Sequence, residues 1–186
     1  MDRREFVQSG AALLLAGCGS GADEMPQEFT IQQSPKFRTT KQAFDFGVEG
    51  IWVPVLTFET PGDLVVAYAT QVGRYVRHLN EIRCAFYIVT NTFTHTTAAL
   101  DCRIAGLPFT SGNPETGALF SEGSLAFQGI TKANYTQFIP YVPAATDRIQ
   151  FLCSGQGQGV VDLQTGDMPT GVQKVLIGSV TYTTSN

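Results

Sequence analysis

The stretch EIRCAFYIV, residues 81–89, alternates apolar side chains with the others in the way a β-strand with one buried face requires. Successive side chains of a strand point to opposite sides, so every second residue shares a face. The apolar face here carries Ile82, Cys84, Phe86 and Ile88. The segments ALDCRI (99–104) and RIQFLC (148–153) repeat the arrangement, each with a cysteine on the apolar face. The three segments therefore predict half-buried antiparallel strands.

Similar runs continue from residue 53 to the end of the chain, about eight in all, and turn sequences such as Pro61-Gly62-Asp63 separate them. No helical periodicity or long internal repeat interrupts the series. The sequence predicts an all-β fold, an antiparallel β-sandwich of the jelly-roll-like kind with about eight strands. We expect an extended N-terminal arm in front of it.

Composition limits the class of partner. The net charge is −4, only 15% of the residues are charged, and the arginines and lysines form no run. Nucleic-acid binding needs clustered basic side chains, so nucleic acid is excluded as an expected partner. The chain also lacks an apolar stretch of the roughly 18 residues that a membrane helix requires.

Three cysteines follow the same alternation. Cys84, Cys102 and Cys153 each fall on the apolar face of their strand, where a free thiol behaves as a small hydrophobic group. Buried thiols are the first interpretation, and a disulfide between Cys84 and Cys102 is the alternative. No CxxC pair or neighbouring histidine accompanies them, so no metal site is predicted.

The chain divides into three parts. Residues 1–25 are leader-like, residues 26–47 are a polar connector with two prolines, and residues 48–186 hold the strands. The leader resembles a twin-arginine export signal at Arg3-Arg4, followed by the lipobox Leu15-Ala16-Gly17-Cys18. A lipid on Cys18 would then anchor the protein. The alternative is that residues 1–47 are retained as an attachment arm.

Five short motifs occur in order within residues 50–186. They are Gly50–Leu56, Gly73–Val76, Phe93–Thr97, Gly106–Phe109 and Gly178–Tyr182. In order and spacing they resemble the C-terminal β-domain of bacteriophage tail-fibre and spike proteins. The resemblance implies a trimeric surface module that touches the host cell. The long shaft that precedes such domains is missing here, so residues 1–47 would supply the attachment.

No catalytic constellation stands out. His78 and His95 are the two histidines, and neither accompanies a nucleophile elbow or a metalloprotease motif. Asp162 and Asp167 lack EF-hand spacing. We predict no enzyme activity, no cofactor and no metal. A polysaccharide depolymerase with a carboxylate pair such as Glu59 and Asp63 is kept as an alternative.

A binding surface is the stronger expectation, because loops on a rigid sandwich carry function more often than its strands. Residues 91–97 and 131–135 combine an aromatic ring with neutral hydrogen-bonding groups, which suits a sugar. The predicted contact residues are Phe93, His95, Asn134 and Tyr135. The Gly-rich loop of residues 111–123 is the alternative location.

The sequence thus predicts a phage virion protein, a short fibre, spike or decoration protein, on the virion surface. Its expected partners are two further copies in a homotrimer, other virion proteins through the arm, and a host-surface glycan or receptor. Faces carrying Tyr68, Tyr75 and Tyr87 are expected to contact a symmetric partner. A bacterial or prophage-derived surface lipoprotein, anchored in the membrane, remains the alternative.

Overall fold

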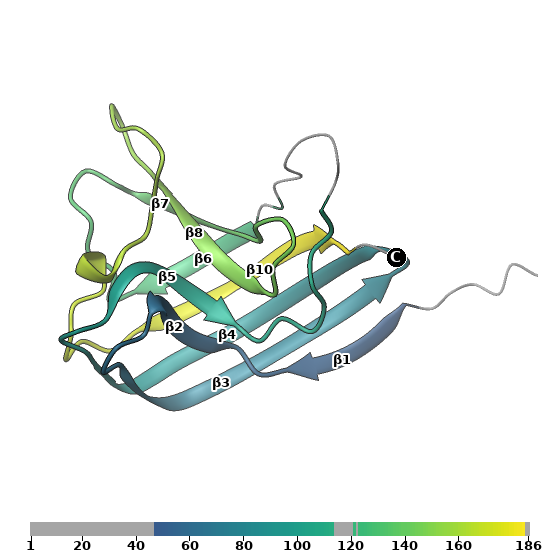
Figure 1. The fold of residues 1–186 in the computed structure, drawn as a ribbon, viewed down its shortest axis with the longest axis horizontal. Helices are drawn as coiled ribbons and strands as arrows, with labels where there is room; N and C mark the ends of the chain where they lie inside the picture. The colour runs from purple at the N-terminus through teal and green to yellow at the C-terminus, as the bar shows by residue number, and fades with distance from the viewer. Residues whose placement is uncertain (1–46, 114–120, 122, 185–186) are drawn as a thin grey trace, which may run out of the picture. The chain divides into compact units, whose positions relative to one another are not determined.

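A computed structural model describes residues 47–113, 121 and 123–184 (Figure 1). The leader-like segment with Cys18 and the connector up to residue 46 lie outside these residues. The elements are β1 (Val48–Trp52), β2 (Val55–Thr60), β3 (Val65–His78), β4 (Glu81–Thr94), β5 (Ala99–Ala105), β6 (Gly123–Gln128), β7 (Gln137–Tyr141), β8 (Arg148–Ser154), β9 (Val161–Asp162), a 3-10 turn η1 (Thr165–Asp167) and β10 (Val175–Thr183). Within this part of the chain no helix is long and apolar enough to cross a membrane.

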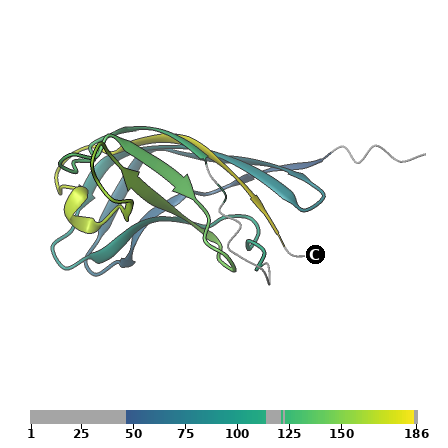
Figure 2. The ribbon, with the colours of Figure 1, turned by 90° about the horizontal axis from the view of Figure 1, so that it is seen from above.

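The strands form two antiparallel sheets that pack face to face (Figures 1 and 2). The first sheet has five strands in the order β1-β3-β4-β10-β6. The second has the order β2-β5-β8-β7, and β9 pairs with β8. The prediction of an all-β antiparallel sandwich is confirmed. The described residues form ten strands, two more than the eight runs found in the sequence.

The two additional strands have separate causes. β1 exists because the chain leaves the first sheet at Val53-Pro54 and enters the second at β2, so one run of sequence serves both sheets. Proline cannot donate to a ladder, which suits a residue between two edge strands. β9 has only two residues, too few for any periodicity to reveal it.

The core lies between the sheets and follows the alternation expected from sequence. Ile82, Cys84, Phe86 and Ile88 of β4 are at most 3% exposed and face residues of β5 and β8. Burying side chains of this size stabilises the fold by roughly 1.5–3 kcal/mol each. Cys84, Cys102 and Cys153 are buried free thiols, so the interpretation as thiols is confirmed and a Cys84–Cys102 disulfide is not formed.

Two motifs have structural roles. Trp52 ends the edge strand β1 and covers one end of the core at 6% exposure, with its ring over the backbone of Gly73. Gly106 has φ +92° and begins a turn that buries Leu107 and packs Phe109 edge-to-face on Tyr75.

Candidate functional site: the β6–β7 edge and its adjoining loop

Phe93 does not lie in a loop, and this prediction is wrong. It belongs to β4, is 2% exposed, and packs edge-to-face on Phe58. The cause is a bulge: Tyr68 pairs with Thr90 and Ala67 with Thr92, which leaves Asn91 as an extra residue in β4. An extra residue reverses the faces beyond it, so Phe93 turns inward. Its ring face is unavailable to a sugar.

His95 follows β4 directly and is half-buried. Its Nε2 lies 2.9 Å from the carbonyl oxygen of Met168, and its backbone N–H donates to Thr170 Oγ1. Because a carbonyl only accepts, Nε2 carries the proton. The ring also packs edge-to-face on Phe58 and Phe93. Through these contacts His95 holds the β4–β5 turn against residues 168–170.

Asn134 and Tyr135 lie in the loop between β6 and β7. Asn134 is exposed with φ +66°, a conformation that asparagine tolerates better than most residues. Tyr135 is half-buried, and Lys132 Nζ lies 5.3 Å from its ring centroid. Lys132 is fixed in turn by an ion pair of 2.6 Å with Asp167 of η1.

The segment of residues 165–170 connects the two predicted loops. Asp167 holds Lys132 of one loop, while Met168 and Thr170 hold His95 of the other. The predicted loops therefore meet at one end of the sandwich. Sequence reasoning missed the role of this segment, because a single aspartate in a short turn carries no sign of its partner.

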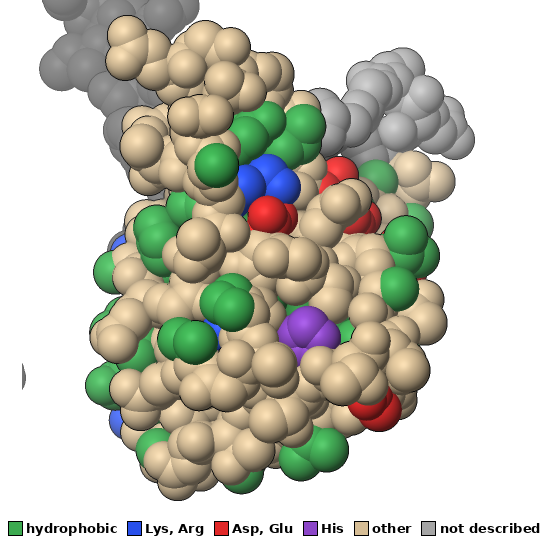
Figure 3. Space-filling model, turned by 90° about the vertical axis from the view of Figure 1, so that its left-hand side faces the viewer, with side chains coloured by type: hydrophobic (Ala, Val, Ile, Leu, Met, Phe, Trp, Pro, Cys, Tyr) green, Lys and Arg blue, Asp and Glu red, His purple; other side chains and the backbone are tan. Residues whose placement is uncertain are grey.

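Figure 3 shows this end of the domain. Uncharged polar side chains and backbone form most of its surface, and acidic and basic groups are few. Neutral donors and acceptors suit sugar hydroxyls better than they suit a charged ligand.

A groove runs beside this loop along one edge of the sandwich. β6 ends the first sheet and β7 ends the second, so each has one unpaired edge. Between them lies a cavity of about 280 Å³. Thr136, the residue after Tyr135, is one of the residues that line it. It is lined by Gly123, Ser124, Leu125, Phe127, Thr136, Gln137, Phe138 and Ile139.

The chemistry of this groove is aromatic and neutral. Phe127 is 38% exposed, and its ring packs edge-to-face on the buried Phe138 with centroids 4.6 Å apart. Gln137 Oε1 accepts a hydrogen bond from Ser154, which leaves its amide N–H groups available to donate. An exposed ring beside amide and hydroxyl groups is the combination that the sequence analysis sought at Phe93. The groove supplies it through Phe127, which sequence reasoning missed.

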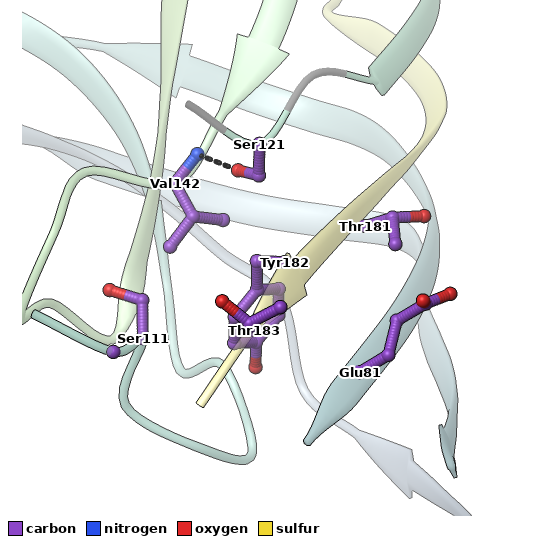
Figure 4. Close-up of a pocket in the computed structure, with 8 residues that line it drawn as sticks. Glu81, Ser111, Ser121, Val142, Thr181, Tyr182 and Thr183 are labelled. Carbon is purple, nitrogen blue, oxygen red and sulfur yellow. Dashed lines mark hydrogen bonds between the residues drawn. The ribbon is translucent and has the colours of Figure 1, made fainter. Parts of the chain in front are cut away.

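A second cavity, of about 160 Å³, lies at the opposite end of β4 and β10 (Figure 4). Ser111, Gly112 and Ser121 of the alternative loop line it. Ser111 Oγ donates to Pro143 O and accepts from Thr146 N–H, and Ser121 Oγ accepts from Val142 N–H. In Figure 4 the polar atoms of Glu81 and Thr181 point away from these serines. This cavity is shaped by hydroxyls that hold loops in place.

The carboxylates considered for catalysis have structural partners. Glu59 forms an ion pair of 2.9 Å with Arg103. Asp63 accepts hydrogen bonds from Thr96 and Thr97, which hold its pKa well below the ordinary value. Among the described residues no three His, Cys, Asp or Glu side chains form a group that could hold a metal ion.

Comparison with known proteins gives one structural neighbour. No family model and no curated protein matches the chain. A crystal structure of the Dettilon tailspike protein (gp208) is similar, with a TM-score of 0.53 at 18% sequence identity. The match covers 74% of this chain and 24% of the tailspike chain, so this chain spans about a quarter of that protein's length. The fold of the described residues therefore resembles part of a phage tailspike.

Proposed function

We propose that this protein is a bacteriophage virion component of the tail-fibre or spike type that binds a host-surface saccharide without cleaving it. The observation that carries the proposal is the fold similarity to a phage tailspike. The order and spacing of the sequence motifs support the same class independently. On the virion surface the domain would act as a homotrimer, joined to other virion proteins by residues 1–47.

The saccharide would lie in the β6–β7 groove, next to Asn134 and Tyr135. The partly exposed ring of Phe127 would cover the apolar face of a sugar, and Gln137 would donate to its hydroxyls. None of the described residues that line the groove is charged, which favours a neutral sugar over a uronic or sialic acid. Individual sites of this kind are weak, and three copies would raise avidity by a factor of about 10² or more.

The proposed test is binding of the full chain to an array of bacterial surface polysaccharides, followed by titration calorimetry on any saccharide found. The wild type should bind a neutral saccharide. Phe127→Ala should weaken binding at least tenfold, because the aromatic ring that packs on the apolar face of the sugar is lost. Phe127→Leu keeps the apolar contact with Phe138 and should also weaken binding.

The matched control is Val160→Ala, which changes an exposed apolar residue away from the groove and should leave affinity unchanged. Binding of Phe127→Ala at wild-type strength would move the contact to another surface. Release of reducing ends from the bound saccharide would contradict the non-catalytic role.

The virion assignment has its own test. Mass spectrometry of purified phage particles should detect this chain. A diacylated species starting at Cys18 in host membranes would instead support the lipoprotein.

A further inference from the structure

The outer face of the five-stranded sheet carries an unusual number of exposed apolar side chains. Six large ones lie on it, each 43–82% exposed: Ile51, Val65, Val72, Val76, Tyr87 and Ile177. Contiguous apolar surface of this kind on a soluble protein generally marks an interaction site.

The strand registers place three of these residues beside one another. Val72 pairs with Tyr87, Tyr87 with Ile177, and Ile177 with Ala126, which makes one uncharged row across four strands. Tyr68 and Tyr75 do not join this face, contrary to the sequence-based expectation. The Tyr68 hydroxyl accepts the backbone N–H of Leu56, and the Tyr75 ring covers Gly50 and packs on Phe109, so both point inward.

The charges on the same face are balanced. Glu49 and Arg83 flank Val76 on its two sides, Arg74 lies between Ile51 and Ala85, and Glu81 pairs with His78. Two acidic and two basic side chains give this face no excess of either sign. A nucleic acid or an anionic membrane would be matched by a basic excess, whereas the same face on the neighbouring copies of a homotrimer offers both signs of charge.

The dimensions also suit a protein partner. Five strands about 4.8 Å apart, the longest with 14 residues, give a face on the order of 800 Å². Covering this face would therefore remove from each copy about as much surface as one partner loses in a stable protein–protein interface.

We infer that the outer face of the five-stranded sheet is the surface through which copies of this chain associate, with the Val72–Tyr87–Ile177 row at the centre of the contact. The inference rests on the assembly proposed above and is independent of saccharide binding. The groove between β6 and β7 lies at the edge of the sandwich, so copies joined through the sheet face leave it open.

The test is sedimentation velocity of the full chain with substitutions on this face. Val72→Thr/Tyr87→Thr/Ile177→Thr keeps residues that favour strands but removes apolar surface. We expect an oligomer for the wild type and the monomer mass of about 20 kDa for the triple variant. Val160→Thr/Val172→Thr, which changes exposed valines outside this face, should remain oligomeric.

Charge reversal separates a second copy from any other partner. Arg74→Glu/Arg83→Glu should dissociate the oligomer, because like charges then face one another. Adding Glu49→Arg/Glu81→Arg in the same chain restores both signs and should restore the oligomer. Only association between copies is rescued in this way.

A wild type that is monomeric at micromolar concentration, or a triple variant that stays oligomeric with an unchanged melting temperature, would overturn the inference. In the second case the proposed assembly would stand and its surface would be elsewhere. Saccharide binding, measured separately, reports on the groove alone, so loss of one proposal leaves the other intact.

Discussion

The carboxylate of Asp63 accepts hydrogen bonds from the backbone N–H and the hydroxyl of Thr96, 33 residues away. It also accepts the N–H of Thr97 at 2.7 Å. Asp63 belongs to the β2–β3 turn and Thr96 to the β4–β5 turn, so one side chain ties together two turns that each cross from one sheet to the other. Hydrogen bonds from both threonines, the Thr96 hydroxyl first, hold the pKa of Asp63 well below its usual range.

This contact predicts a destabilisation that depends on pH. Asp63→Asn should lower the melting temperature at pH 7, because an amide accepts fewer and weaker hydrogen bonds than a carboxylate. A folded-state pKa below the unfolded value stabilises the protein above about pH 4 and loses that effect as pH falls through the folded pKa. The difference in melting temperature between the two proteins should therefore shrink below pH 4. A constant difference between pH 7 and pH 3 would contradict the assignment.

Lys174 predicts that stability also rises with pH, in the alkaline range. Its side chain is fully buried, with Nζ 2.6 Å from Pro169 O and 4.8 Å from the Phe93 ring centroid. Burial lowers the pKa of Lys174 from 10.5 to about 8. Between these two values the unfolded chain binds more protons than the folded one, so the free energy of unfolding rises with pH.

We expect the free energy of unfolding of the wild type, relative to Lys174→Met, to rise by up to about 3 kcal/mol between pH 7.5 and 10.5. Denaturant titration at several pH values measures it. Burial also raises the pKa of Cys84 and Cys153 to about 12. These thiols destabilise the fold above pH 9 in both proteins. Their contribution therefore cancels in the difference between the wild type and Lys174→Met. A difference that stays flat with pH would show that Lys174 titrates normally.

Gly73 predicts a steric effect with an internal control. A Cβ on Gly73 would lie 2.6 Å from the Trp52 ring, so the indole would have to move from its place over the core. Gly73→Ala should lower the free energy of unfolding by about 1–3 kcal/mol. Gly159 has no heavy atom within 4 Å of its added Cβ, so Gly159→Ala should leave stability within about 0.5 kcal/mol. Equal effects of the two substitutions would show that Trp52 is not held by Gly73.

The strand alternation was readable from sequence because each strand has one buried face, as at Ile82 to Ile88. The order of the strands was not, since β4 pairs with β10, about 90 residues later, and no local signal encodes that choice. Phe93 was misplaced because one inserted residue, Asn91, reverses the faces of β4. The groove at Phe127 escaped prediction because it exists only where two edge strands from different sheets meet.

His95 was predicted as a contact residue, and its geometry leads to a last prediction that separates structure from binding. The imidazole donates to Met168 O and packs edge-to-face on Phe58 and Phe93. His95→Phe keeps an aromatic ring but leaves the Met168 carbonyl without its donor, so it should cost about 1 kcal/mol of unfolding free energy. His95→Ala removes the ring as well and should cost about 2–4 kcal/mol. Denaturant titration of the three proteins measures both steps.

Saccharide affinity of His95→Phe should equal that of the wild type, since the groove between β6 and β7 does not include this residue. A tenfold loss of affinity with little loss of stability would return His95 to the binding surface.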